Sequence, residues 1–530
     1  MPVKRQTVAR GEPRAAETYW DRTAGHTDFP ALSGAVNVDV AVVGGGIVGV
    51  TAARALKDLG LTVAVVEALR VGKGVTGRST AKVTSLHRLK YQTLQRKFGE
   101  SGAKLYAEAQ EAGRRKIAKF ASLHAIDCDL QPKAAYTYTR EERNVSSIEE
   151  EVEIARRLGL QAEFVRDTDL PFDVKAAIRL PEQAQFHPSN YLVGLAGTIP
   201  GDGSHLFENS RVVDWGPRYA KTEGGEVKAG CVVMATHLPL GQIGGYYARA
   251  YPKAEPLVAA KIARDFDGMY INVEHPSRSF RTHTAQDGTI YGIAVGESFK
   301  PGDTDGERES VKAIERWLLQ EFEAGPIECR WVNEDYSSMD QAPFVGWSST
   351  AGDGYLVATG FGAWGITNGT AAGLVLADLA AGRDNPWLDI FRASRVKPIA
   401  GAAQFLKGNV EVAAHLAGGY LSRKLRSFAE LPRGGAAIMR VGGDNVAAYR
   451  DEQGVVHAVS AVCSHMGCLV GWNATDLTWD CPCHGSRFDL EGAVLHGPAV
   501  APLKALQPEA PQEGGEKELV GGELRQGSNR

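Results

Sequence analysis

Apolar and polar residues alternate in a strand, turn, helix, strand order over residues 38–67. Residues 38–43 form a short apolar run rich in β-branched side chains, which is typical of a buried parallel strand. Residues 50–59 have the apolar spacing of a helix, and residues 61–66 form a second apolar run. The pattern predicts one β-α-β unit.

The turn of this unit has the form G-x-G-x-x-G, with Gly44, Gly46 and Gly49, and the second strand ends at Glu67. Such glycines allow a tight turn, close approach of the backbone to a pyrophosphate, and packing of the helix on the strand. The helix N-terminus attracts phosphate, and the acid suits ribose hydroxyls. We therefore predict dinucleotide binding; the alternative is a glycine-rich turn in an unrelated α/β domain.

The same patterns predict further elements along the chain. Residues 269–273 and 289–295 are expected to be strands of a separate antiparallel sheet. From residue 434 short strands and frequent turns indicate a small all-β domain. The other expected elements are helices over 94–120, 148–158 and 311–322, short strands over 211–214, 231–235 and 355–359, and a glycine-rich turn over 360–369 that leads into a helix ending near residue 382.

Composition limits the possible classes of protein. The 530 residues are 43% hydrophobic and 23% charged, with a net charge of −4, which gives no indication of a nucleic-acid partner. No apolar run approaches the roughly 18 residues of a membrane span, and no apolar segment follows the basic N-terminus as in a signal peptide. We expect a cytoplasmic protein.

Four of the seven cysteines lie within 21 residues, in the strings C-S-H-M-G-C and C-P-C-H-G-S-R-F. Cys463, His465, Cys481 and His484 have the form C-x-H…C-x-x-H. Two thiolates and two imidazoles bind one zinc ion, or they hold a [2Fe-2S] cluster with cysteines on one iron and histidines on the other.

Both strings resemble the cluster loops of Rieske proteins. The resemblance implies that Cys463 and Cys481 ligate one iron and that His465 and His484 ligate the other. It also implies a disulfide between Cys468 and Cys483, and a hydrogen bond from Ser486 to a bridging sulfide.

One position departs from the high-potential Rieske pattern. Phe488 stands where those proteins usually carry a tyrosine, whose hydroxyl donates to a ligand sulfur and raises the reduction potential. We expect a potential below the top of the Rieske range of about −150 to +300 mV.

The first 390 residues resemble the glycine-oxidase/D-amino-acid-oxidase family of FAD-dependent enzymes. The resemblance rests on the glycine turn with Glu67, the G-R-S-T-A-K loop, the A-T-H string at residues 235–237 and the G-F-G-A-W-G-I-T-N-G turn at residues 360–369. It implies that FAD is bound by Gly44, Gly46, Gly49, Glu67, Arg78, Ser79, Thr80, Lys82, Val213, Thr236, Gly360, Trp364, Gly365, Ile366 and Thr367.

The family suggests oxidation of a C–N bond, but one substrate position differs. Many of its amino-acid oxidases have W-x-x-x-R-P, whose arginine binds the substrate carboxylate, whereas this chain has Asp335 there and Arg330 nearby. A carboxylate attracts an ammonium, so we expect an amine or amino-acid-like substrate. The alternative is that Asp335 is a solvated or ion-paired acid.

Other catalytic candidates carry alternatives of their own. His187 either faces the flavin or caps a helix, and Arg281 either lines the substrate pocket or is structural. A Rieske oxygenase needs a second iron on two histidines and a carboxylate. The pair His275 and His283 offers little support for one, and no second G-x-G-x-x-G indicates an NAD(P)H site.

The expected fold is a Rossmann-like α/β FAD-binding domain with an inserted antiparallel α+β substrate domain, followed by an all-β Rieske domain. The expected boundaries are an N-terminal arm over 1–37, the oxidoreductase over 38–390, a helical linker over 391–433, the Rieske domain over 434–510 and a tail over 511–530. Within the oxidoreductase, the FAD-binding parts are about 38–130, 185–250 and 335–390, and the substrate parts are about 131–184 and 251–334.

Two cofactors on one chain suggest a function. Substrate would reduce FAD by two electrons, and the cluster would pass them singly to an external one-electron carrier. Two alternatives remain open: an external donor reduces the cluster, which then reduces the flavin, or the protein is a non-catalytic redox sensor.

Overall fold

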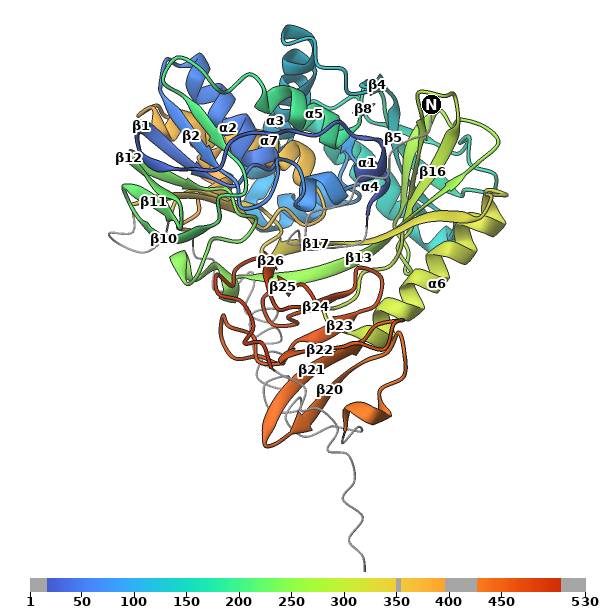
Figure 1. Ribbon diagram of the computed structural model, residues 1–530. Helices are drawn as coiled ribbons and strands as arrows, with labels where there is room; N and C mark the ends of the chain where they lie inside the picture. Colours follow the sequence, from blue (N-terminus) through green and yellow to red (C-terminus); the bar gives the residue numbers. More distant parts are fainter. Residues whose placement is uncertain (1–16, 349–353, 396–426, 507–530) are drawn as a thin grey trace, which may run out of the picture.

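The computed structural model describes residues 17–348, 354–395 and 427–506. Figure 1 shows two large sheets with their helices above a small β domain, which lies beneath both. The expected fold class is confirmed: an α/β part, an α+β part and a C-terminal antiparallel β part.

The first sheet contains the strands predicted around the glycine-rich turn. Its central strand, β1, pairs in parallel with β2 on one side and β12 on the other, as a β-α-β unit requires. Its eight strands are β10 (Val212–Gly216), β11 (Tyr219–Thr222), β12 (Gly225–Met234), β1 (Gly34–Val43), β2 (Val63–Val66) and β9 (His205–Phe207) in spatial order, with β19 (Tyr355–Thr359) beside β12 and β18 (Phe344–Trp347) beside β19.

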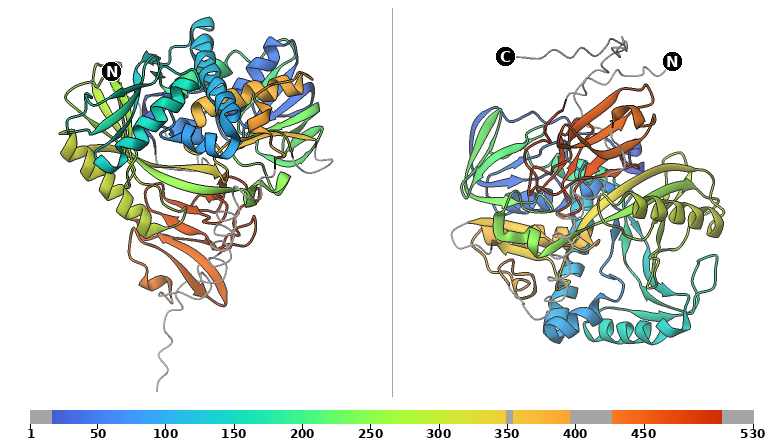
Figure 2. Two further views of the ribbon diagram at one scale, coloured as in Figure 1. Left: turned by 180° about the vertical axis from the view of Figure 1, so that it is seen from behind. Right: turned by 90° about the horizontal axis from the view of Figure 1, so that it is seen from below.

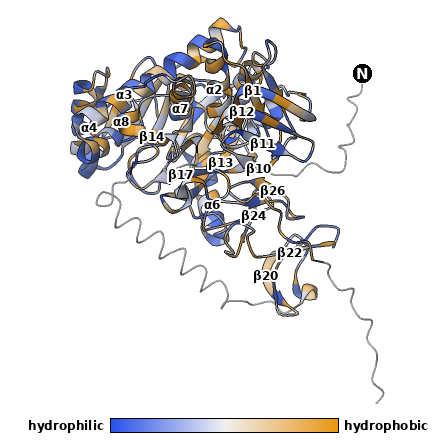
Figure 3. Cartoon of the chain, turned by 90° about the vertical axis from the view of Figure 1, so that its left-hand side faces the viewer, coloured by the Kyte–Doolittle hydropathy of each residue, from blue (hydrophilic) through white to orange (hydrophobic). Residues whose placement is uncertain are grey.

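Helices pack on this sheet through small residues. A Cβ atom on Gly373 would lie 2.8 Å from the Cβ of Thr51, so glycine allows two helices, α7 and α2, to approach closely. Figure 3 shows hydrophobic segments along β1 and β12, which these helices help to bury. The helices of this region are α2 (Ile47–Asp58), α3 (Lys90–Leu123), α5 (Pro188–Ala196), α7 (Gly365–Ala380) and α8 (Leu388–Phe391).

The second sheet is antiparallel except where β14 pairs in parallel with β5. Its strands β13 and β17 are 12 residues long and run above the small β domain (Figure 1). In spatial order the strands are β17 (Ile327–Ser338), β13 (Ala250–Lys261), β16 (Ile290–Val295), β15 (Ser279–Thr284), β14 (Gly268–Asn272), β5 (Ala134–Thr139), β7 (Ala176–Leu180) and β6 (Glu163–Val165), with α4 (Val145–Arg157) and α6 (Thr304–Glu321) nearby.

The C-terminal domain has two small antiparallel sheets around an aromatic core. Trp479 and Phe488 are fully buried there, and Trp472 stacks on Tyr449 with ring centroids 5.0 Å apart. One sheet consists of β20 (Ala436–Val441), β21 (Asp444–Arg450) and β22 (Val456–Ser460), and the other of β23 (Gly471–Asn473), β24 (Thr478–Asp480), β25 (Arg487–Phe488) and β26 (Val494–His496). Seen from below in Figure 2, this domain lies against the parts of the body that contain both large sheets.

Short elements connect these parts. They are α1 (Tyr19–Thr23), a sheet of β3 (Lys82–Val83), β8 (Ala184–Gln185) and β4 (Gln131–Pro132), and the 3-10 turns η1 (Val75–Arg78), η2 (Glu142–Asn144), η3 (Ile243–Ala248) and η4 (Phe428–Glu430). Within the expected N-terminal arm, the aromatic rings of α1 are buried. Residues 1–16 of the arm, residues 396–426 of the expected linker and the expected tail lie outside the described residues.

Candidate active site

A cavity of about 1320 Å³ lies between the first sheet, strands β13 and β17, and the C-terminal domain. Ordinary small-molecule pockets are about 300–1,000 Å³, so this one has room for an extended dinucleotide and a second small molecule. Its lining includes Gly44, Gly46, Ile47, Glu67, Arg78, Thr80, Val213, Thr236, His237, Glu255, Leu257, Val295, Asn333, Asp335, Gly365, Ile366, Arg487 and His496.

The glycine turn between β1 and α2 opens onto this cavity. Gly44 has φ +108°, and a Cβ atom on it would lie 2.5 Å from the carbonyl oxygen of Ala235. A Cβ atom on Gly49 would lie 2.0 Å from the carbonyl oxygen of Gly44. Only glycine fits either position, and the resulting turn exposes the N-terminus of α2, which favours phosphate binding.

Glu67 ends β2 beside this turn. Its carboxylate accepts hydrogen bonds from the backbone N–H groups of Gly45, at 2.6 Å, and Leu69, at 2.9 Å. Burial raises the pKa of the Glu67 carboxyl, and these two hydrogen bonds oppose that rise. The acid therefore fixes the glycine turn as well as lining the cavity.

The structure separates the expected FAD-binding residues into two groups. Those that line the cavity are Gly44, Gly46, Glu67, Arg78, Thr80, Val213, Thr236, Gly365 and Ile366. Those that do not are Gly49, Ser79, Lys82, Gly360, Trp364 and Thr367.

Residues of the second group stabilise the cavity walls from behind. The Lys82 ammonium donates to the carbonyl oxygen of Tyr270 at 2.8 Å, and burial lowers its pKa to about 7. Trp364 directly precedes α7 and stacks on His87, with ring centroids 4.4 Å apart. Thr367 donates its hydroxyl to the carbonyl oxygen of Thr84 at 3.0 Å.

Asp335 lines the cavity, but protein groups occupy both of its oxygens. His237 Nε2 lies 2.8 Å from Oδ1, and the backbone N–H of Ala363 donates to Oδ2. Arg330 points elsewhere and forms an ion pair with Glu315 on α6. These contacts match the alternative of an ion-paired acid better than a free ammonium site.

His187 and Arg281 lie outside the cavity lining. His187 caps α5, because its Nδ1 accepts from the backbone N–H of Asn190 at 3.2 Å, and burial lowers its pKa to about 3. Arg281 is fully buried and donates to the carbonyl oxygens of Thr80 and Phe186, at 3.0 and 3.1 Å. The contact of Arg281 with Thr80 holds one residue of the cavity wall in place.

Two polar residues on the cavity wall, Glu255 and Asn333, belong to no sequence motif and were not predicted. They are direct partners across the antiparallel pair β13–β17, and Leu257 and Asp335 share their face of the sheet. In the described part of the chain, Asn333 Oδ1 is buried without a hydrogen-bond partner and the Glu255 carboxylate has none either. The strand alternation was visible in the sequence, but the register that brings the two residues together was not.

The four expected cluster ligands converge on two adjacent loops. Cys463 and Cys481 are buried, and a thiol hydrogen bond between them lowers the pKa of Cys463 to about 7. The rings of His465 and His484 are 5.0 Å apart, and burial lowers the pKa of both. The same hydrogen bond raises the pKa of Cys481 well above its usual value, so the two thiols share a proton, while the neutral imidazoles are in the form that metal ligation requires.

The orientation of the histidines fits an iron-sulfur cluster. Among the described residues, Nδ1 of His465 and Nδ1 of His484 are buried and have no hydrogen-bond partner. His465 uses its Nε2–H instead, which donates to the carbonyl oxygen of Gly241 at 3.1 Å. This bond fixes the tautomer and leaves Nδ1 for an iron.

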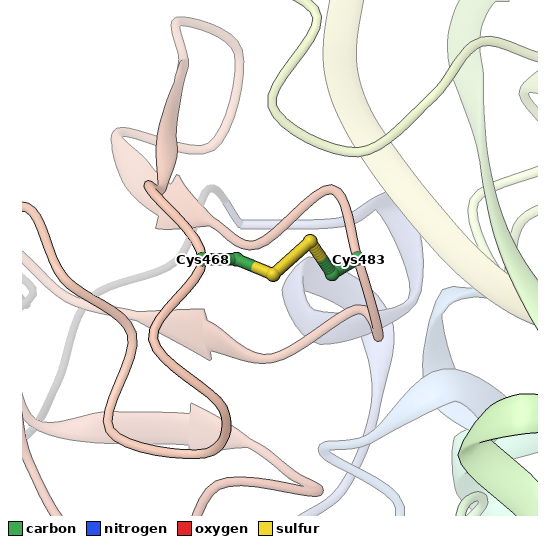
Figure 4. The surroundings of a disulfide bond; sticks show 2 residues. All are labelled: Cys468 and Cys483. Atoms are coloured by element: carbon green, nitrogen blue, oxygen red, sulfur yellow. A yellow bond between two sulfur atoms is a disulfide. The ribbon is translucent and has the colours of Figure 1, made fainter. Parts of the chain in front are cut away.

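The two ligand loops are connected by a disulfide between Cys468 and Cys483, the pair that the Rieske resemblance implied (Figure 4). The sulfurs of this pair and of Cys481 lie within 4.8 Å of one another, but the disulfide sulfurs are not free thiolates. Ser486 lies beside Cys463 and hydrogen-bonds its thiol.

The histidine side of these loops faces the part of the chain that contains the two large sheets, residues 17–348 and 354–395, which is called the flavin body from here on. The Tyr336 hydroxyl, from β17, donates to the carbonyl oxygen of His484 at 2.8 Å. Tyr247 meets the rings of both histidines edge to face, at 5.7 and 5.3 Å between centroids. The expected cluster site is therefore packed against this body, with His484 buried and His465 partly exposed.

Buried charges join the two parts. Asp476 of the C-terminal domain accepts from Arg78 of the flavin body at 2.5 Å and from Arg487 of its own domain at 2.6 Å. Asp476 is fully buried, and the two arginines are less than 10% exposed. Arg78 and Arg487 both line the cavity, so the domain contact forms part of its wall.

Comparison with known proteins assigns both parts. The family described as FAD dependent oxidoreductase (DAO) matches residues 39–379, which is more than half of the chain. The chain belongs to this family. The description Rieske [2Fe-2S] domain matches residues 423–507 of the same DAO-family chain.

Individual relatives agree. The protein YhfW of Bacillus subtilis, whose name describes a Rieske 2Fe-2S iron-sulfur protein, is 34% identical over 498 residues, 93% of this chain and 98% of YhfW. The gamma-glutamylputrescine oxidoreductase of Escherichia coli is 24% identical over 67% of this chain and 87% of its own. The glycine oxidase structure from Geobacillus kaustophilus shares the fold, with a TM-score of 0.56 and 18% identity over 68% of this chain and 100% of its own.

The protein is therefore a DAO-family flavoprotein that binds FAD and a Rieske [2Fe-2S] cluster. The glycine turn and the large cavity fit FAD, and the two buried Nδ1 atoms and two thiols fit the cluster. None of the helices in the described ranges has the length and apolarity of a transmembrane segment.

Proposed function

We propose that this protein oxidises a C–N bond of an amine or amino-acid-like small molecule and passes the electrons singly through its cluster to an external one-electron carrier. Bound FAD supplies the two-electron oxidation, and the Rieske cluster supplies one-electron steps. The chain's own residues bind and orient the substrate and hold the two cofactor sites together.

One observation carries the electron-transfer part of this proposal. The C-terminal domain contributes Arg487 and His496 to the cavity that fits FAD, and the histidine side of its ligand loops contacts the same body. A domain placed there for stability alone would have no need to turn its ligand loops toward this body. The arrangement favours direct exchange between the two cofactors.

The polar pair Glu255 and Asn333 supports the choice of substrate. Burial, and next the charge of Asp335, raise the pKa of the Glu255 carboxyl to about 7. An ammonium group would donate to the Glu255 carboxylate and to Asn333 Oδ1. The apolar side chains of Leu257 and Val295 on the same wall would contact the carbon chain of such a substrate.

The test is anaerobic mixing of the holoprotein with a panel of primary amines, diamines, N-acylated diamines and amino acids. Flavin absorbance and the EPR signal of the reduced cluster are followed together. We expect one class of compound to bleach the flavin, with the reduced Rieske signal rising afterwards.

Two other results would replace the proposal. If no compound bleaches the flavin, but a reduced ferredoxin-like donor fills the cluster and then the flavin, electrons enter at the Rieske end. If neither cofactor turns over while both titrate reversibly, the protein is a redox sensor.

A further inference from the structure

Three polar side chains form a continuous hydrogen-bonded row across the boundary between the flavin body and the Rieske domain. Asp335 comes from β17, His237 from the loop after β12, and His496 from the end of β26. His237 Nε2 lies 2.8 Å from Asp335 Oδ1, and His237 Nδ1 lies 3.1 Å from His496 Nε2. All three residues line the cavity.

The backbone of His237 is held in an unusual conformation to complete this row. Its φ of +68° lies in the left-handed region, which residues other than glycine rarely adopt. Such a conformation persists only where the surroundings enforce it, and it tends to occur at functional sites. Here it directs the ring between a carboxylate of one domain and an imidazole of the other.

We propose that Asp335, His237 and His496 form a proton path that accompanies electron transfer between the flavin and the cluster. This inference rests on the proposed function, because it requires electrons to pass between the two cofactors. Each ring nitrogen in the row donates or accepts according to the tautomer of its ring, so the row conducts a proton in either direction.

The proton and electron count calls for such a path. Reduced FAD carries two electrons and two protons beyond oxidised FAD, whereas each reduction of the cluster takes one electron and no proton from the flavin. Two successive cluster reductions, each followed by oxidation by the external carrier, therefore leave two protons to remove. Each of the two protons passes from the cavity to Asp335, through His237 to His496, and from His496 to water where the C-terminal domain lines the cavity.

The charges around the row favour the passage of a proton over its retention on one of the three side chains. The pKa of His496 is lowered well below its usual value by burial first, and then by His237, Arg487 and Arg211. A neutral His496 accepts a proton only in passing. Near the other end, Asp335 interacts electrostatically with Glu255 and with Lys90.

The test uses the complete protein with both cofactors and bypasses the substrate. The flavin is reduced by a light pulse with a photosensitiser and a sacrificial donor, and the rise of the reduced-cluster EPR signal is timed in H2O and in D2O. We expect slower transfer in D2O for the unmodified protein. Replacement of His496 or His237 by glutamine should slow the transfer about 10²-fold, the lower range for a lost acid–base group.

Two further variants separate a relay from a docking contact. His496→Ala should regain much of the rate when free imidazole is added, because imidazole restores the proton carrier. His457→Gln is the matched control, since His457 lies on β22 and pairs with Asp451 away from the row. It should transfer electrons at the normal rate, with the normal solvent isotope effect.

The outcomes are distinct. An unmodified protein without a solvent isotope effect, or His496→Gln with a normal rate, would overturn the relay and leave the proposed function standing. Slow transfer in His496→Gln with the full isotope effect, together with no recovery of His496→Ala by imidazole, would show only a docking contact, which also overturns the relay. An unmodified protein that transfers no electrons would overturn the proposed function and the relay together.

Discussion

The cavity and the cluster site are built in opposite ways. The cluster ligands Cys463, His465, Cys481 and His484 come from two loops within 22 residues, connected by one disulfide. The cavity is lined by residues that range from residue 17 to residue 500, with contributions from both large sheets and the Rieske domain. A local site is readable as a motif, whereas a dispersed one depends on the fold.

The largest expected effect is the loss of the cluster, and it tests whether the cluster site and the FAD cavity are independent of each other. Cys481→Ser replaces a buried thiolate with a weaker ligand for iron, so the cluster should be lost completely while FAD remains bound. Iron analysis and EPR measure the cluster, and the visible flavin spectrum measures FAD. Cys329→Ser, at a buried cysteine outside the ligand loops, is the control and should keep both cofactors.

If Cys481→Ser also loses FAD, the Rieske domain is needed to close the cavity. That result would mean that the cluster site stabilises the FAD cavity. The two sites would then differ in how their residues are spread along the sequence, but they would not be independent in the folded protein.

The next effect concerns the charges that join the two regions. Asp476→Ala leaves Arg78 and Arg487 buried without their shared carboxylate, which typically costs about 3–5 kcal/mol. We expect a lower unfolding temperature and weaker FAD retention, because both arginines line the cavity. Differential scanning fluorimetry, with flavin fluorescence as a second signal, measures both.

Asp444→Ala provides the comparison, since Asp444 is exposed on β21 of the same domain. Its expected change is within about 0.5 kcal/mol. Equal unfolding temperatures for the two variants would show that the ion pairs contribute nothing to holding the domains together.

The residues that the sequence revealed belong to sites whose chemistry requires a fixed local spacing. The glycine turn and Glu67 follow a fixed spacing because the chemistry of a pyrophosphate site is local, and the structure places them on the cavity. The ligand strings are equally local. Family membership and both cofactors are confirmed by the comparisons with known proteins.

Long-range packing explains what the sequence could not reveal. Glu255 and Asn333 are 78 residues apart and meet only through the register of β13 and β17. His496 reaches His237 only because the Rieske domain sits on the cavity. Arg78 belongs to a loop expected to bind FAD, yet its guanidinium forms an ion pair with another domain.

Glu255 gives the next prediction, which concerns the dispersed site alone. Glu255→Gln should weaken the binding of an ammonium-bearing substrate by about 1.5–3 kcal/mol. This loss would appear as a KM roughly 10- to 150-fold higher. Because burial raises the pKa of Glu255 to about 7, the carboxyl is neutral below that pH and charged above it. For the unmodified protein, kcat/KM should therefore fall as the pH drops through about 7, and the variant should lack that step.

Glu226→Gln is a matched control, since Glu226 lies on β12 outside the cavity lining. It should keep the pH step. If Glu255→Gln has an unchanged KM for every amine, the ammonium is bound elsewhere and the amine assignment loses its structural support.

The smallest expected effect returns to the local site and one side chain. Phe488 is fully buried on β25, in the same hydrophobic core as Cys463 and Cys481. Phe488→Tyr adds a hydroxyl, and a bond from it to a ligand sulfur should raise the reduction potential within the Rieske range of about −150 to +300 mV. Redox titration followed by EPR measures the shift, and Phe488→Leu controls for packing.

The change in reduction potential shows whether residues of the cluster motif alone set that potential. A rise in potential with Tyr but not with Leu would show that one position of the motif sets the potential. An unchanged potential, accompanied by a loss of about 1–3 kcal/mol of stability, would show an unpaired buried hydroxyl instead. The potential would then depend on contacts with the flavin body, such as the bond from His465 to Gly241, and the Rieske site would share the dispersed character of the cavity.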